Sequence, residues 1–195
     1  MTIGVLALQG DFAAHLEALA RERITGVDVR YAVQLREVDG LIIPGGESTT
    51  LLNLISERRL EAPLRDFHAR GGALFGTCAG AILLSRTVTH PAQPSFDLID
   101  IDVERNGYGR QKESFETEEV VEAFGEAPVP MIFIRAPRIR RIGPGVEVLA
   151  SSGGEPVMVR QGLVLAGTFH PELGGDGRPH RYFAAMAAGG VLAPS

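Results

Sequence analysis

GALFGTCAGAILL, residues 72–84, consists of two apolar runs that enclose a short turn bounded by glycines. Residues 72–75 predict a buried strand, and residues 81–84 predict the start of a helix. Cys78, the only cysteine in the chain, lies in the turn between them. Because a strand followed directly by a helix is the repeating unit of α/β proteins, this stretch indicates that class of fold.

The turn at Cys78 has the form of a nucleophile elbow, G-x-C-x-G, with sulfur in place of the serine hydroxyl. Gly76 and Gly80 would let the strand and the helix approach closely around a strained, exposed side chain. The N-terminus of the following helix would favour the thiolate. A free cysteine is more often a buried, inert side chain. The motif alone therefore leaves a catalytic and a structural cysteine as equal alternatives.

Size and composition predict one globular domain that spans residues 1–195. Hydrophobic residues make up 45% of the chain and charged residues 22%, which is ordinary for a globular protein. The net charge of -5, without a long basic run, argues against binding to nucleic acid or to an anionic membrane. We therefore expect small molecules or proteins as partners.

No feature of the sequence predicts export or membrane insertion. A single cysteine excludes an intrachain disulfide, and the first strand begins without a basic leader before it. No apolar stretch is long enough to span a bilayer. The sequence therefore predicts a soluble cytoplasmic protein.

Strands and helices alternate at short spacing through the first half, which predicts a doubly wound, mostly parallel α/β sheet in a single three-layer domain. The expected strands are 3–8, 27–31, 38–43 and 72–75. Three helices are expected: the first covers 11–23 with Asp11 as N-cap, the second is capped by Ser48 or Thr49 and runs through residue 55, and the third covers 61–70. In the second half, short strands joined by Gly/Pro turns predict antiparallel edge structure at 100–104, 131–134, 146–150, 156–159 and 163–168. The basic run 138–141 is expected to be a solvated surface.

His170 and Glu172 follow the last of these strands. If the backbone stays extended there, alternation places both side chains on the same side, where the carboxylate can orient the imidazole. Acyl transfer from a thiol needs such a base and such a third group. Two alternatives remain: His170 merely ends the strand while Glu172 is solvated, or His180 is the base.

Gly45 and Gly46 follow another predicted strand and form a third element. Two glycines let a loop turn its amides toward a substrate, so the amides of Gly46 and Ala79 could form an oxyanion hole. The loop lacks the lysine and the spacing of a Walker A motif, which disfavours ATP.

These motifs together resemble the class I (triad) glutamine amidotransferases: GTCAG at 76–80, PGGES at 44–48 and HPE at 170–172. Four further segments look like the family of glutaminase subunits of pyridoxal 5'-phosphate synthase: ALQGDF at 7–12, VERNGYGRQ at 103–111, FIRAP at 133–137 and FHPEL at 169–173. The resemblance covers essentially the whole chain. Residues 89–97 depart from it, because they are richer in proline and polar groups than is usual there.

The resemblance implies that the protein hydrolyses L-glutamine to glutamate and ammonia. The ammonia would pass to a separate (β/α)8-barrel subunit, which makes pyridoxal 5'-phosphate from ribose 5-phosphate and glyceraldehyde 3-phosphate. It implies Cys78 as nucleophile, His170 as base and acid, and Glu172 as the orienting carboxylate, with no metal and no cofactor. Family contacts to glutamine fall on Gly46, Glu47, Ser48, Arg105, Ile134 and Arg135.

Two other classes of function remain possible. Cysteine-elbow α/β proteins include other amidotransferase subunits, hydrolases and deglycases. A non-enzymatic regulatory subunit could use the same fold, with Cys78 as a redox sensor.

Overall fold

A computed structural model describes residues 1–107 and 114–189 of the chain. Residues 108–111 of the family segment 103–111 therefore lie outside the described residues. No helix in the described ranges is long and apolar enough to cross a membrane.

A seven-stranded sheet in the order β10-β11-β12-β4-β3-β1-β2 forms the middle of the molecule. Its strands are β1 (Thr2–Leu6), β2 (Thr25–Val29), β3 (Gly40–Ile43), β4 (Ala73–Thr77), β10 (Glu147–Ser152), β11 (Glu155–Gln161) and β12 (Val164–Gly167). The five strands from β12 to β2 are parallel, and β10 and β11 add an antiparallel edge. Strands β3, β4 and β12 are buried at every residue, as expected for strands that are covered on both faces.

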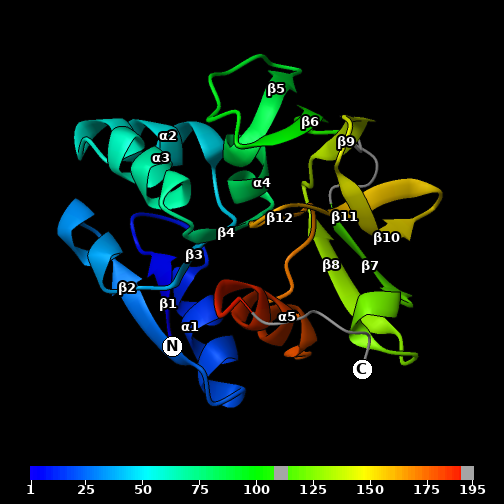
Figure 1. The fold of residues 1–195 in the computed structure, drawn as a ribbon. Coiled ribbons are helices and arrows are strands. Elements are labelled where there is room, and N and C mark those ends of the chain that lie inside the picture. The colour runs from blue at the N-terminus through cyan, green and yellow to red at the C-terminus, as the bar shows by residue number, and fades with distance from the viewer. Residues whose placement is uncertain (108–113, 190–195) are drawn as a thin grey trace.

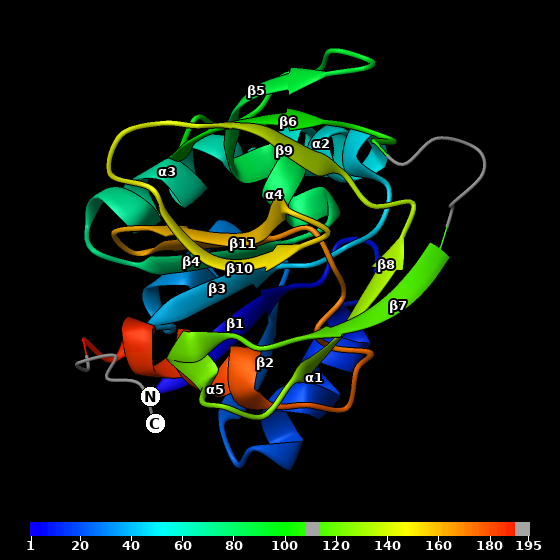
Figure 2. The same ribbon diagram turned by 90° about the vertical axis from the view of Figure 1, so that its right-hand side faces the viewer.

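Helices cover both faces of this sheet, which gives three layers (Figures 1 and 2). One face carries α2 (Ser48–Glu57), α3 (Glu61–Ala69) and α4 (Ala79–Leu84), and the other carries α1 (Phe12–Arg21) and α5 (Arg178–Ala187). Two short 3-10 helices, η1 (Ala32–Arg36) and η2 (Glu122–Phe124), complete the helical elements of the described residues. The predicted doubly wound α/β architecture with antiparallel edge strands is confirmed. Of the five ranges expected to form that edge, only 146–150 and 156–159 lie there. The range 163–168 contains the interior strand β12, which is parallel to β4, and the ranges 100–104 and 131–134 belong to separate sheets.

Two small sheets lie outside the central one. Strands β5 (Ser85–Thr89), β6 (Ile99–Glu104) and β9 (Arg138–Ile142) form a sheet whose apolar residues join the core under α2, α3 and α4. Strands β7 (Ser114–Glu119) and β8 (Val129–Ile134) form an antiparallel hairpin that packs into the core on the α1 and α5 side. The hairpin brings the end of β8 to the edge of the sheet where the parallel strands end (Figure 2).

Several local predictions were wrong. Helix α2 begins at Ser48 and is capped by Glu47, whose carboxylate accepts hydrogen bonds from the amides of Thr49 and Thr50, so neither Ser48 nor Thr49 is the cap. Asp11 is the N-cap residue of α1, as predicted, although its side chain makes no capping hydrogen bond.

The sequence also failed to predict β5, β7, β9 and α5. The run 138–141 is strand β9 rather than only a solvated surface, and its arginines pair with carboxylates on neighbouring strands. Arg141, for example, lies 2.6 Å from Asp100 and 2.7 Å from Asp102.

Candidate functional site

The turn after β4 holds Cys78 in a strained backbone conformation with φ +47° and ψ −101°. Its amide donates to the carbonyl of Gly167 on the neighbouring strand at 2.8 Å. A Cβ on Gly80 would lie 2.0 Å from the carbonyl oxygen of Ile43, and one on Gly76 would lie 2.5 Å from the carbonyl carbon of Gly80. The predicted close approach of strand and helix is confirmed. The predicted exposure of Cys78 was wrong, because the residue is 6% exposed and lines a cavity.

His170 and Glu172 meet as predicted, but for a different geometric reason. Strand β12 ends at Gly167, and the chain then turns, with the amide of Leu173 donating to the carbonyl of His170 at 3.3 Å. The turn brings Nδ1 of His170 to 2.7 Å from Oε1 of Glu172. The amide of His170 also donates to the carbonyl of Ile132 on β8 at 2.8 Å. Glu172 is 3% exposed, so the alternative of a solvated carboxylate is wrong.

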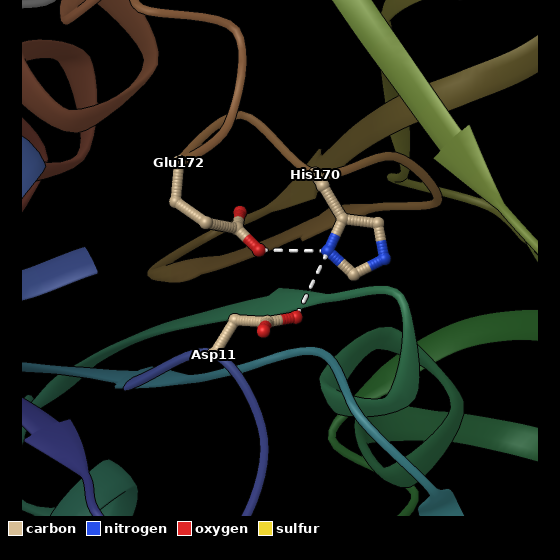
Figure 3. A group of neighbouring side chains, drawn as sticks. All are labelled: Asp11, His170 and Glu172. Carbon is tan, nitrogen blue, oxygen red and sulfur yellow. Dashed lines mark hydrogen bonds and ion pairs between the residues drawn. The ribbon is translucent and has the colours of Figure 1, made fainter. Parts of the chain in front are cut away.

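The charge on His170 is set by its neighbours. Burial would lower its pKa, but hydrogen bonds and charge interactions with Cys78 and Glu172 outweigh burial and raise the pKa to about 10. Oδ2 of Asp11 lies 3.5 Å from the same Nδ1, so two carboxylates approach one imidazole (Figure 3). The cationic form of His170 is therefore favoured at neutral pH.

A cavity of about 210 Å³ opens beside Cys78 and His170. The other residues that line it are Asp11, Gly46, Glu47, Ser48, Ile82, Arg105, Asn106, Ile134 and Arg135. The six predicted glutamine contacts thus surround one space with the predicted nucleophile and base. Glu172 lies behind His170, outside the lining, and His180 does not line the cavity either.

Glu47 and Arg105 place opposite charges in this cavity. Nη2 of Arg105 lies 3.2 Å from both Oε1 of Glu47 and the hydroxyl of Thr49. Burial works against the charge of Glu47, but hydrogen bonds from Thr50 and Thr49 and the charge of Arg105 hold its pKa below the ordinary value. The pair can offer a carboxylate to an ammonium group and a guanidinium to a carboxylate.

The atypical segment 89–97 reaches this site. The hydroxyl of Ser48 donates to Oε1 of Gln93 at 3.0 Å. Ser48 is 3% exposed, so its hydroxyl is already engaged within the fold. The segment that departs from the family pattern therefore binds the side chain of Ser48, one of the predicted glutamine contacts.

The glycines at 45 and 46 are required by close packing. A Cβ on Gly45 would lie 2.4 Å from Cε1 of His170, and one on Gly46 would lie 2.6 Å from Oε1 of Gln9. Gly46 has φ +146°, a value that side chains rarely allow. The loop thus presses against the imidazole, while the oxyanion role of Gly46 and Ala79 stays a prediction.

Sequence reasoning missed several residues around the triad. Asp11 contacts His170, and two buried histidines, His15 and His180, lie behind Glu172. The sequence around His15 gives no sign of its contacts with Glu172 and His180, because both partners come from the other end of the chain.

Asp11, His170 and Glu172 offer ligand atoms within 4.8 Å of one another, the one such group found among the described residues. The 2.7 Å bond between His170 and Glu172 already uses two of these atoms. A cation would have to break that bond, so the cluster fits a base with its orienting carboxylate better than a metal centre. The expectation of no metal stays a prediction.

Comparisons with known proteins agree with this geometry. Residues 5–188 match the profile of the SNO glutamine amidotransferase family. A curated relative, "Pyridoxal 5'-phosphate synthase subunit PdxT" of Koribacter versatilis, is 54% identical over 191 residues, which cover 97% of each chain. The protein of the same name from Thermus thermophilus is 54% identical over 187 residues, which cover 95% of this chain and 97% of that protein.

A solved structure described as a glutamine amidotransferase has the same fold. It superposes with a TM-score of 0.90 at 50% identity and covers 95% of this chain and 98% of its own. The architecture is therefore that of the class I glutamine amidotransferases.

Proposed function

The chain belongs to the SNO glutamine amidotransferase family, and from that premise we propose that it is the glutaminase subunit of a pyridoxal 5'-phosphate synthase. It hydrolyses L-glutamine to glutamate and ammonia and delivers the ammonia to a synthase subunit. The observation that supports this most directly is the 2.7 Å bond between His170 and Glu172 at a cavity that Cys78 also lines.

In the first half of the reaction, the sulfur of Cys78 attacks the side-chain amide carbon of glutamine as a thiolate, its proton being carried by His170. The C–S bond forms, and the carbonyl oxygen becomes an oxyanion. His170, in its cationic form, then protonates the amide nitrogen, and ammonia leaves as the C–N bond breaks. Glu172 orients the imidazole and stabilises its charge, so that the proton is carried on the nitrogen that faces the substrate.

In the second half, water hydrolyses the thioester. Neutral His170 takes a proton from the water, whose oxygen attacks the thioester carbon. The C–S bond breaks, the thiolate and the imidazolium are restored, and the new carboxylic acid leaves and loses its proton to become glutamate. One imidazole thus serves as acid and then as base.

The substrate is held by charges that complement an amino acid. We assign its α-carboxylate to Arg105 and Arg135, and its α-ammonium to Glu47, each through a charge-assisted hydrogen bond. Gly46, Ser48 and Ile134 complete the contacts. The existing pair of Arg105 and Glu47 must open to the substrate, which supplies both opposite charges and so compensates for the lost contact.

The amides of Gly46 and Ala79 are assigned to the oxyanion hole. The loop of Gly45 and Gly46 packs against Gln9 on one side and His170 on the other, so a small shift of this loop changes both the hole and the base. We therefore expect low activity from the isolated chain and higher activity once a (β/α)8-barrel synthase subunit docks.

A cytoplasmic location belongs to the same proposal, because a catalytic thiol works only where it stays reduced.

The test of this function follows the nitrogen. Amide-15N glutamine is supplied with ribose 5-phosphate, glyceraldehyde 3-phosphate and the synthase subunit, and pyridoxal 5'-phosphate is analysed by mass spectrometry. We expect the label in the product only when this chain is present. Added ammonium should bypass the requirement. Labelled product without this chain, or unlabelled product with it, would overturn the proposal.

A further inference from the structure

Two buried histidines extend the triad away from the substrate. We propose that His15 and His180 are positioning residues that hold the carboxylate of Glu172 in place, so that it can orient the imidazole of His170. This inference rests on the proposed glutaminase function, because it concerns the same base. Neither side chain lines the cavity, so both act through Glu172 rather than on the substrate.

The contacts form a continuous row through the interior between α1 and α5. Nε2 of His180 lies 2.9 Å from Nδ1 of His15. Nε2 of His15 lies 3.3 Å from Oε2 of Glu172 and 3.1 Å from the hydroxyl of Thr77, the residue before Cys78. His15 and His180 are both 0% exposed.

The carboxylate of Glu172 is thus approached from both sides. Its Oε1 accepts from Nδ1 of His170, while its Oε2 has no aligned hydrogen bond among the described residues. His15 is the group that faces this second oxygen. A buried carboxylate needs such a donor, because desolvation of an unpaired charged oxygen is costly.

Electrostatics selects one tautomer for each ring. If Nε2 of His15 carried no proton, its lone pair would face the carboxylate of Glu172, which is repulsive. Nε2 must therefore carry the proton, and Nδ1 must accept from Nε2–H of His180. This leaves Nδ1 of His180 as a bare acceptor, which agrees with its lack of a hydrogen-bond partner among the described residues. The donors in the row then run from His180 through His15 to the end that holds Thr77 and Glu172, with the Nε2–H of His15 shared between the hydroxyl at 3.1 Å and the carboxylate at 3.3 Å.

Both rings are neutral in this arrangement. Burial, followed by the charges of His180 and His170, lowers the pKa of His15 well below its ordinary value. Burial, followed by the charge of Arg21, lowers the pKa of His180 to about 4. The row therefore supplies directed dipoles to Glu172 without a second positive charge that would compete with His170.

The test compares three variants of the full-length chain in complex with the synthase subunit, with glutamate release as the readout. His15→Leu replaces the donor with an apolar side chain of similar size. We expect kcat to fall by about 10- to 100-fold, with KM for glutamine unchanged. His15→Gln retains an N–H that can reach Glu172, and it should restore most of kcat. His180→Leu leaves His15 in place and should lower kcat less than His15→Leu.

Leu19→Ala is the matched control, because Leu19 lies one turn further along α1, is fully buried and lines no part of the cavity. It should lower the melting temperature and leave kcat unchanged. If His15→Leu lowers kcat no more than this control does, or if His15→Gln is as impaired as His15→Leu, the inference is wrong.

Ring-nitrogen NMR of the wild-type chain gives a readout that needs neither activity nor a folded variant. We expect neutral, Nε2-protonated rings for His15 and His180. A cationic ring or an Nδ1-protonated His15 would overturn the inference. If the wild-type complex released no glutamate, the proposed function would fail, while this NMR result would still test the row of histidines.

Discussion

At the scale of single residues, the charge of His170 depends on two neighbours that oppose the effect of burial. Its pKa of about 10 reflects hydrogen bonds and charge interactions with Cys78 and Glu172. Cys78→Ala removes one of the two neighbours that raise the pKa of His170 and leaves the opposing effect of burial in place, so we expect this pKa to fall. An NMR titration of the ring measures this directly.

The pKa of His170 also carries a consequence for stability. Because it is raised above the ordinary value of 6.5, the cationic ring stabilises the folded chain below about pH 6.5, and this contribution is lost as the pH rises toward 10. Cys78→Ala should therefore flatten the fall of the unfolding free energy over this range. An unchanged pKa and an unchanged pH profile in the variant would contradict the assigned interaction.

Arg105 tests substrate recognition at the same scale. Arg105→Ala removes a charge-assisted contact of the kind that contributes about 1.5–3 kcal/mol, so KM for glutamine should rise by roughly 10- to 150-fold. Arg30→Ala is the control, because Arg30 pairs with Asp28 at 2.9 Å and does not line the cavity. Equal KM values for the two variants would remove Arg105 from the proposed site.

At the scale of elements, the elbow depends on how closely α4 approaches the sheet. Gly80→Ala would place a Cβ 2.0 Å from the carbonyl oxygen of Ile43, and neither backbone can move far. Overpacking of this kind costs about 1–3 kcal/mol, and more where backbone must shift. We expect a urea titration to show that loss of unfolding free energy.

Gly167→Ala is the comparison for this prediction. The nearest atom to a Cβ there is 3.7 Å away, which is an ordinary contact, and the backbone has no positive φ. It should cost much less than Gly80→Ala. Equal losses of unfolding free energy in the two variants would contradict the claim that close packing at residue 80 excludes a side chain from the elbow.

The elements that sequence reasoning found are those with a local signal. Strands β3 and β4 are apolar runs, and α3 shows a helical spacing of apolar residues. Strand β9 was missed because its arginines pair with carboxylates from distant parts of the chain, and charge in a sequence does not reveal its partner. Helix α5 did carry a signal in the sequence, a proline in its first turn and largely apolar residues at 179, 182, 183 and 186, which the structure shows to be buried.

At the scale of the whole molecule, we propose that residues 1–195 unfold as one domain. Leu41 and Ile43 of β3 belong to the core on one face of the sheet, and Ile42 belongs to the core on the other. Loss of either core would therefore expose the strand that the other one needs. Calorimetry should give one transition with equal calorimetric and van't Hoff enthalpies. Two transitions would divide the chain into two units.

The candidate site could be predicted in its centre but not in its surroundings. Cys78, His170 and Glu172 follow strands that are adjacent and parallel, so their meeting follows from the fold class. The contact of His15 with His180 joins residues 165 positions apart on two helices, and no local pattern encodes it. The charge pair of Arg105 and Glu47 likewise needed the structure.

The central claim is that Cys78 is the nucleophile of a glutaminase, and the most direct test is the rate of glutamate release from glutamine in the presence of the synthase subunit. The account predicts steady release by the wild-type chain and none above background by Cys78→Ala, with circular dichroism and binding to the synthase subunit unchanged. Release by the folded variant at the wild-type rate would contradict it.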